Sequence, residues 1–160
     1  MRYFGIFILI CAVFLIWRCY CGYVEDEAKM SRAFLFALRD YREKIKCYLI
    51  SPSEWASGYG DEALRASGFT DKIKSGETMI TAYLDTRSGM YLPMVVDEAL
   101  KSCFMRLGEG DAYAEVETLE STIAVLEGEV KTINEQLPKR QKAVGALLGA
   151  CAVGVVILMI

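Results

Sequence analysis

The charges of this chain are confined to its middle, and both ends are apolar. All 21 acidic residues lie between Glu25 and Glu135, and no charged residue occurs in the stretches 3–17 and 143–160. The chain has 160 residues, of which 54% are hydrophobic, above the usual ~45–50%. This distribution argues against an ordinary soluble domain, a disordered tail and a nucleic-acid-binding protein.

The first apolar run, residues 3–17, is 15 residues long, which is shorter than the ~17–25 that a spanning helix needs. It becomes long enough if Arg18 extends its charge to the membrane interface and the helix continues to Val24. A secretory signal peptide is the main alternative, but the sequence after Trp17 offers no small-residue cleavage site. We therefore predict an uncleaved anchor over residues 1–24.

The second apolar run, residues 143–160, is 18 residues long and follows a basic collar of Lys139, Arg140 and Lys142. This combination predicts a transmembrane helix, with the charged middle of the chain on the cytoplasmic side of the cell membrane. Small residues recur along the run at helix-packing spacing, among them Gly145, Gly149 and Gly154. They either let a neighbouring helix approach closely or reflect the general abundance of glycine in membrane helices.

The strongest periodic signal lies at residues 112–137. Seven apolar residues recur there at spacings that alternate between three and four: Val116, Leu119, Ile123, Leu126, Val130, Ile133 and Leu137. Such a seam requires a second helix along it, and residues 25–49 carry a matching seam from Phe34 to Tyr48. We predict that the two arms, each roughly 37–39 Å long, pair antiparallel as a stalk. The alternative is that one or both seams face another protein.

Residues 50–111 are expected to form a small head at the far end of the stalk. The stretch 51–54 is a capping box with proline at the first helical position, and Trp55 follows as a core anchor. Asp61 can cap another short helix, and the apolar spacing over 96–107 predicts a longer one. No segment alternates as a strand. The predicted fold class is therefore all-α, with two transmembrane helices flanking an antiparallel helical stalk and a small helical head.

The predicted organisation has three parts. An N-terminal transmembrane anchor (1–24) is followed by a cytoplasmic helical domain (25–142) and a C-terminal transmembrane helix (143–160). Motifs for catalysis or cofactors are missing, since the sequence has no P-loop, no Gly-x-Ser-x-Gly and no histidine. The six cysteines form no Cys-x-x-Cys pair, so we expect no metal and no other cofactor. Cys19 and Cys21 are either acylation sites or apolar filler.

A corner between two predicted helices carries a family resemblance. Gly108 fits the left-handed position that ends one helix, and Asp111 fits the N-cap of the next. The pattern comprises Leu107, Gly108, Asp111 and Glu115, then the long heptad helix, the basic collar and the Gly-rich C-terminal run. Over residues 104–160 it resembles the stage III sporulation protein AB family, which usually has Gln at the position of Glu115. We interpret Gly108 and Asp111 as structural, with contact to a partner as the alternative.

The resemblance implies a mother-cell membrane protein of endospore-forming bacteria, within the channel complex that connects mother cell and forespore. The family's domain is similar to the inner-membrane platform protein of type II secretion and type IV pilus machines, on which a cytoplasmic ATPase docks. By that analogy we expect a non-enzymatic scaffold whose partners are the membrane, other sporulation channel proteins and a cytoplasmic ATPase. A homo-oligomer is a further possibility, and nucleic acid is not expected.

Two other functions compete with the scaffold. A regulatory or sensory membrane protein would relay a shift of its anchors through the stalk to a cytoplasmic partner. An intramembrane enzyme would need polar residues inside the anchors, and the uncharged runs 3–17 and 143–160 offer only cysteine. The sequence therefore favours the scaffold, with the sensor as the alternative.

Overall fold

The computed structural model describes residues 2–108 and 111–159, without the side chains at 2–4, 6, 7, 9, 10, 152 and 155–159. Two long helices, α1 (Arg2–Tyr48) and α7 (Ala112–Met159), flank a series of short ones in the sequence. No strand occurs in the part of the chain that the structure describes, so the prediction of an all-α fold is confirmed.

The short helices follow one another closely. They are α2 (Pro52–Gly58), α3 (Glu62–Ala66), α4 (Phe69–Lys74), α5 (Met79–Thr86), the 3-10 helix η1 (Arg87–Gly89) and α6 (Met94–Arg106). Side-chain caps start several of them: the Ser51 hydroxyl accepts a hydrogen bond from the amide of Glu54, and the Asp61 carboxylate accepts one from the amide of Leu64. Both caps were predicted, because a cap is recognisable from neighbouring residues alone.

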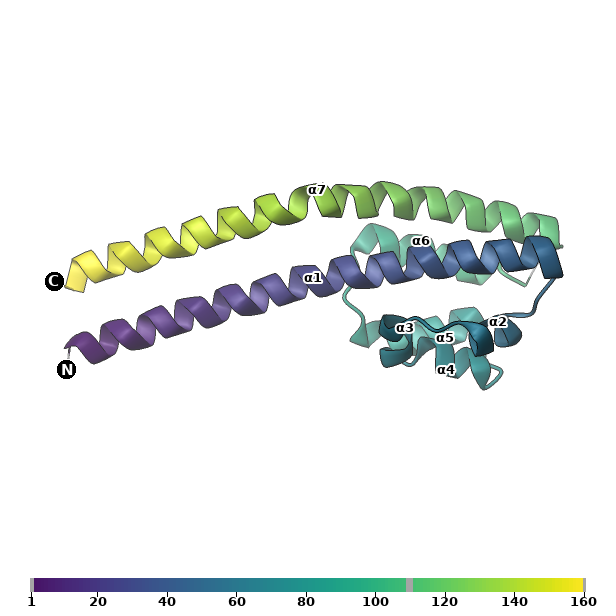
Figure 1. Ribbon diagram of the computed structural model, residues 1–160, viewed down its shortest axis with the longest axis horizontal. Coiled ribbons are helices and arrows are strands. Elements are labelled where there is room, and N and C mark those ends of the chain that lie inside the picture. Colours follow the sequence, from purple (N-terminus) through teal and green to yellow (C-terminus); the bar gives the residue numbers. More distant parts are fainter. Residues whose placement is uncertain (1, 109–110, 160) are drawn as a thin grey trace. The chain divides into compact units, whose positions relative to one another are not determined.

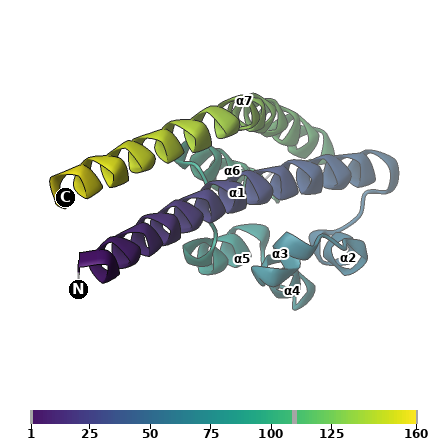
Figure 2. The ribbon, with the colours of Figure 1, turned by 60° about the vertical axis from the view of Figure 1, so that its left-hand side comes forward.

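The chain divides into two compact units, one made of residues 27–132 and the other of 1–26 with 133–160. We call the first the helical domain. Within it, α1 lies between α7 and the short helices α2–α5 (Figures 1 and 2). Phe34 of α1 is therefore fully buried, with its ring centroid 5.3 Å from that of Phe69 and 5.8 Å from that of Tyr83. One continuous core joins α1, α7 and the short helices.

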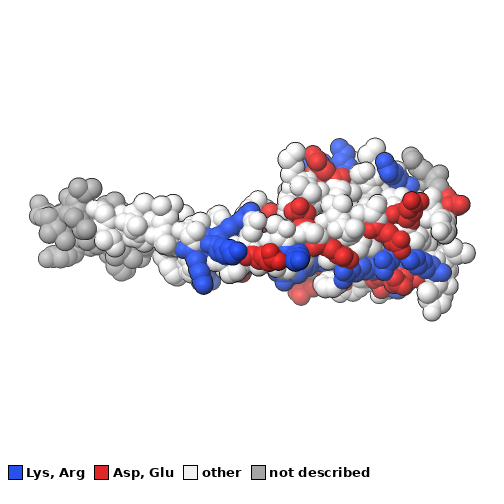
Figure 3. Space-filling view, turned by 90° about the horizontal axis from the view of Figure 1, so that it is seen from above, with Lys and Arg blue, Asp and Glu red and all other residues white. Residues whose placement is uncertain are grey.

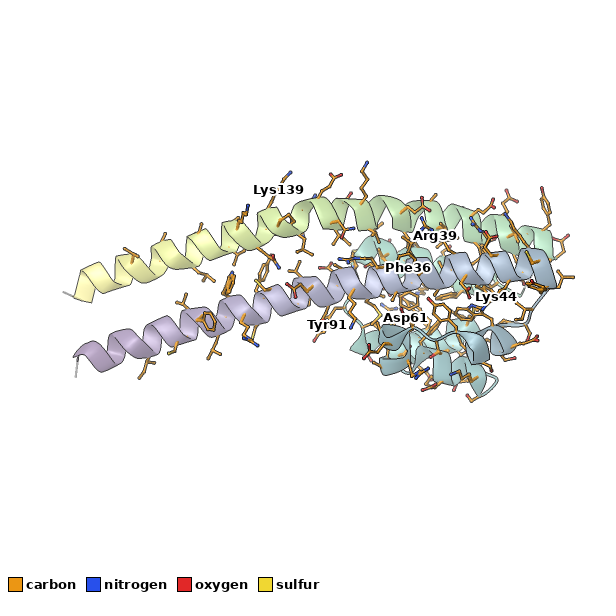
Figure 4. All side chains as sticks on the ribbon, in the orientation of Figure 1. Phe36, Arg39, Lys44, Asp61, Tyr91 and Lys139 are labelled. Atoms are coloured by element: carbon orange, nitrogen blue, oxygen red, sulfur yellow. The ribbon has the colours of Figure 1, made fainter. Side chains whose placement is uncertain are left out.

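The arms of α1 and α7 within the helical domain run antiparallel. Arg39 pairs with Glu127 and Lys46 pairs with Glu120, each at 2.6 Å, so positions that rise along α1 fall along α7. Figure 4 shows Arg39 on α1, and Figure 3 shows acidic and basic side chains interleaved along the surface of this domain. The buried part of the α7 seam comprises Leu119, Ile123, Leu126 and Val130.

The end of the α1 seam departs from the prediction. Phe34, Leu38 and Ile45 are buried as expected, but Tyr48 is 79% exposed. Helix α1 ends at Tyr48, and Leu49 adopts a left-handed φ of 51°. The placement of Tyr48 in the seam is therefore wrong, because the chain turns away toward α2 before this side chain can reach α7.

We call residues 1–26 with 133–160 the apolar unit. Gln141 donates a hydrogen bond to the Glu25 carboxylate at 3.1 Å, and a Cβ added at Gly145 would lie 3.3 Å from Trp17 Nε1. Large apolar side chains nevertheless face outward. Ile8, Phe14, Leu15, Ile16, Leu147 and Val153 are each 52–66% exposed.

The predicted membrane anchors are not distinguished as separate helices. α1 continues through residue 24, and α7 continues through Pro138 and the basic collar. Over the residues that the structure covers, no helix has an apolar stretch long enough to cross a bilayer. The predicted anchors 1–24 and 143–160 also include Met1, Ile160 and other side chains that lie outside the described residues.

Candidate functional site

A pocket of about 460 Å³ opens in the helical domain where four segments meet. These segments are the end of α1 with the start of α2, the turn before α5, the end of α6 and the first turn of α7. The lining residues are Tyr41, Ile50, Ser51, Pro52, Ser53, Gly76, Glu77, Thr78, Met79, Leu107, Gly108 and Glu115. We call this the corner pocket, because it includes three of the four residues of the predicted corner.

The corner itself is held by reciprocal capping. Gly108 has a φ of 93°, in the left-handed region that glycine adopts without strain. Its amide donates to Glu115 Oε1 at 2.9 Å, and the Asp111 carboxylate accepts from the amide of Ala114 at 2.9 Å. Glu115 thus returns to the end of α6 from the first turn of α7. Leu107 is half-buried against the core, and residues 109 and 110 lie outside the described part of the chain.

Tyr41 forms the inner wall of the corner pocket. Its side chain is only 2% exposed, and its ring lies 5.3 Å from the ring of Trp55. Burial raises the pKa of its hydroxyl well above the usual value, and the negative charge of Glu115 raises that pKa further. Among the described residues, no group forms a hydrogen bond with this hydroxyl. The pocket wall therefore includes a tyrosine hydroxyl that has no hydrogen-bond partner in the described part of the chain.

The charge of the pocket wall is negative. Glu77 and Glu115 line it, and no Lys or Arg of the described chain does so. The Glu77 carboxylate lies 3.3 Å from Lys72 Nζ, so it is already compensated. Glu115 has the Gly108 amide but no ion pair within the described residues. One carboxylate of the pocket is therefore left without a countercharge.

The chain around the pocket exposes large apolar side chains. Tyr48, Leu49 and Tyr113 are 79%, 75% and 83% exposed. Leu49 has a left-handed φ, which costs conformational energy in a residue with a β-carbon. Its side chain nevertheless stays exposed in that conformation. Leu49 and Tyr113 line one shallow depression together with Ile45 and Val116, and exposed apolar groups gathered in this way are typical of an interaction surface.

The cysteine, tyrosine and carboxylate groups inside the helical domain are held by burial and by internal hydrogen bonds. Cys103 is buried, and desolvation raises the pKa of its thiol to about 11, so it is protonated near neutral pH. No group of three or more Cys, Asp or Glu side chains in the described chain could hold a metal ion. Tyr83 donates to Asp97, which also accepts from Arg87 at 2.9 Å, so this network is satisfied internally.

The other predicted site residues lie in the apolar unit. Lys139, Arg140 and Lys142 are exposed, and Arg140 donates to Gln136 at 2.7 Å; Lys139 is labelled in Figure 4. The glycine row is not uniform. Gly145 packs against Trp17, whereas an added Cβ at Gly149 or Gly154 would meet no described atom within 4 Å.

Sequence reasoning identified the corner but not the pocket. It placed Tyr41 in the stalk seam as an apolar residue, and it assigned no role to Glu77 or Thr78. The available signal was a tyrosine, with its hydroxyl, at a seam position that otherwise favours leucine or isoleucine.

The comparisons with known proteins add no relative. No family model matches the chain, and neither a curated protein nor a solved structure does.

Proposed function

We propose that this protein is a non-enzymatic scaffold that its apolar ends fix to a membrane and whose helical domain recruits protein partners. The observation that carries the proposal is the exposure of large apolar side chains in the apolar unit. Each such side chain gains ~1.5–3 kcal/mol on full burial. Six of them are more than half exposed, and a lipid phase would bury these side chains.

The basic collar supports an orientation for this scaffold. Lys139, Arg140 and Lys142 are exposed and stand beside the uncharged run 143–160, as expected for residues on the cytoplasmic side of a membrane. The helical domain, residues 27–132, would then lie in the cytoplasm. There its corner pocket and exposed Tyr113 are accessible to cytoplasmic proteins.

The more particular proposal is the platform component of a sporulation channel between mother cell and forespore, docking a cytoplasmic ATPase. Its support is the resemblance over residues 104–160 to the stage III sporulation protein AB family. The resembling corner has a defined geometry, since Gly108 is left-handed and Glu115 caps it.

A regulatory relay is the second candidate function. Its support is the continuity of the long helices, because α1 runs unbroken over Arg2–Tyr48 and α7 over Ala112–Met159. A continuous helix can transmit a displacement between its ends. The relay and the platform differ in the partner they require.

Membrane attachment is tested with two matched phenylalanines. Phe14 in the apolar unit and Phe36 in the helical domain both lie on α1 and are 54% and 55% exposed. We expect the full chain to stay with membranes after alkaline carbonate extraction. Phe14→Arg should release a large fraction of it, and Phe36→Arg should not. Extraction of the wild-type chain, or equal release of both variants, would contradict the proposal.

Partner recruitment is tested by isolating the full chain in a mild detergent and identifying co-purifying proteins by mass spectrometry. Recovery of a P-loop ATPase supports the platform. Recovery of a response-type cytoplasmic protein without an ATPase favours the relay. Recovery of neither, from cells in which the chain is membrane-bound, would contradict both.

A further inference from the structure

We propose that the corner pocket receives the side chain of an arginine or lysine carried by a protein partner. This inference rests on the proposed function, because it gives the chemistry by which the scaffold recognises the partner it recruits. Three features of the pocket support it: the negative charge of its wall, the hydroxyl of Tyr41 and the apolar residues that share the wall.

Glu115 contributes an uncompensated negative charge to the pocket wall. Its Oε1 accepts from the Gly108 amide, while its Oε2 accepts no hydrogen bond from any residue that the structure describes. The nearby cations of α1 are engaged elsewhere, since Lys46 pairs with Glu120 and Arg42 pairs with Glu43. A cationic group entering the pocket would therefore meet a carboxylate oxygen that is free to accept.

Tyr41 supports the same occupant independently of charge. Tyr41 as a residue is 98% removed from solvent, and a polar side chain in such surroundings gains free energy from a hydrogen-bond partner. The Tyr41 hydroxyl has none among the described residues, and its side chain lines the pocket. A guanidinium or ammonium group carries several N–H donors, so it could donate hydrogen bonds to the Tyr41 hydroxyl and the Glu115 carboxylate at the same time.

Part of the pocket wall is apolar. Ile50, Pro52, Met79 and Leu107 line the same pocket as the polar groups. Arginine and lysine have methylene stems that pack on apolar surface while the charged end reaches a polar group. The pocket therefore matches both halves of such a side chain.

An anion is the competing occupant, because helices α2, α5 and α7 all begin at the pocket. Their first amide groups are already satisfied by side chains: Ser51 accepts from Glu54, Thr78 from Thr81 and Asp111 from Ala114. Two of the lining side chains are also carboxylates. An anion would face these carboxylates without free donors from the helix ends.

The surroundings of the pocket indicate that the basic side chain belongs to a protein. Tyr48, Leu49 and Tyr113 are largely exposed and belong to the segments that form the pocket. Leu49 and Tyr113 line a separate depression on these segments, and exposed tyrosines close to a charged pocket are typical of a protein–protein interface. A free amine would leave these apolar side chains exposed to water, whereas a protein could cover them.

The test uses the full chain in detergent micelles, with tyrosine ring carbons labelled for NMR. The probes are three capped amino acids: acetyl-arginine methylamide, the neutral norleucine analogue and the anionic glutamate analogue. We expect the arginine probe to shift the Tyr41 signal saturably. The norleucine probe should bind about 10-fold more weakly, since it lacks the charge-assisted hydrogen bonds.

Two substitutions locate the site. Glu115→Gln removes the charge but keeps an oxygen for the Gly108 amide, and we expect it to weaken arginine binding about 10-fold. Glu117→Gln, on the exposed face of the same helix turn, is its matched control and should change nothing. Tyr41→Phe should weaken binding less, about 3-fold, with Tyr91→Phe, which does not line the pocket, as its control. Circular dichroism would verify that each variant is folded.

Several results would overturn the inference. They are equal binding of the arginine and norleucine probes, tighter binding of the glutamate probe, an equal effect of Glu115→Gln and Glu117→Gln, or no arginine binding up to the solubility limit. These outcomes are separate from those of the membrane test. A chain that carbonate extracts can still bind arginine, and a membrane-bound chain can fail to bind it.

Discussion

Phe34 and Phe14 lie on the same helix and differ completely in their surroundings. Phe34, in the helical domain, is fully buried among Phe69, Tyr83 and Phe104, whereas Phe14, in the apolar unit, is 54% exposed. Both positions lie in apolar sequence. The difference therefore does not come from composition but from how many other elements are available to cover α1.

In the helical domain, α1 is covered by α7 and by the short helices, so it is buried on two faces, while residues such as Phe36 and Lys46 stay exposed. In the apolar unit the described residues of α1 have only α7 of the same unit as a partner. Two paired helices bury one stripe each and leave their other faces outward. The outward faces of the two helices in the apolar unit therefore need a further apolar environment to cover them, and we propose that this environment is lipid.

The largest expected effect is on the core of the helical domain. Phe34→Ala should lower the free energy of unfolding of this domain by about 3–5 kcal/mol, because it removes a fully buried ring and leaves a cavity. The same change at the half-exposed Phe14 should alter it by less than about 0.5 kcal/mol. Denaturant unfolding of the full chain in detergent, followed by circular dichroism, measures both.

Equal losses of unfolding free energy in the Phe34→Ala and Phe14→Ala variants would contradict the difference drawn between the two units. They would mean that the two units unfold together and that exposure does not separate them. Leu15→Ala serves as a control for the apolar unit, since Leu15 is 59% exposed and lies next to Phe14. It should behave like the Phe14 variant.

The sequence predicted the parts of this fold that depend on neighbouring residues. The caps at Ser51 and Asp61 and the left-handed Gly108 are recognised from a few adjacent positions, and the structure contains all three. The seams of the two arms were recognised because they repeat over several turns. Their buried members include Leu38 and Leu126.

Features set by distant contacts escaped sequence reasoning. Helix α4 has six residues, too few to show a period, and it forms because Phe69 and Ile73 enter the shared core. The second buried face of α1, which includes Ala33 and Ala37, depends on the short helices packing there. Small residues at these positions gave no apolar stripe to recognise.

The candidate site was only half predictable for the same reason. Gly108 and Glu115 belong to one local corner, and the sequence identified them. The corner pocket also needs Tyr41, Pro52 and Glu77, which come from two other segments of the chain. Only the tertiary fold brings these segments together.

The second expected effect is a loss of stability of the helical domain at high pH. Burial raises the pKa of Tyr41 and Tyr83 above the ordinary value of 10, and burial raises that of Tyr59 to about 12. Above pH 10 the unfolded chain loses these protons while the folded chain keeps them, so stability falls as pH rises. The slope is about 1.4 kcal/mol per pH unit for each such tyrosine.

Tyr83→Phe isolates one of these contributions. It removes the hydroxyl that donates to Asp97, so the variant is less stable at pH 8. Between pH 10 and pH 12, however, its stability should fall less steeply than that of the wild type. Parallel slopes for the two chains would show that Tyr83 ionises equally in the folded and unfolded states.

The third effect concerns the corner that joins α6 to α7. Asp111→Ala should cost about 1 kcal/mol, because the amide of Ala114 loses its cap. Asp111→Asn should cost much less, since asparagine also caps helices well. Thermal unfolding of the full chain measures the difference. If Asp111→Ala abolished partner binding without any loss of stability, the structural assignment of Asp111 would be wrong.

The smallest effect tests whether charge or packing holds the arms together. Arg39 and Glu127 are 42% and 48% exposed, so a double-mutant cycle with Arg39→Gln and Glu127→Gln should give a coupling below about 0.5 kcal/mol. Added salt should reduce that coupling further, because exposed charges are screened. A coupling of several kcal/mol would place charge, rather than the buried seam around Leu126, as the main link between α1 and α7.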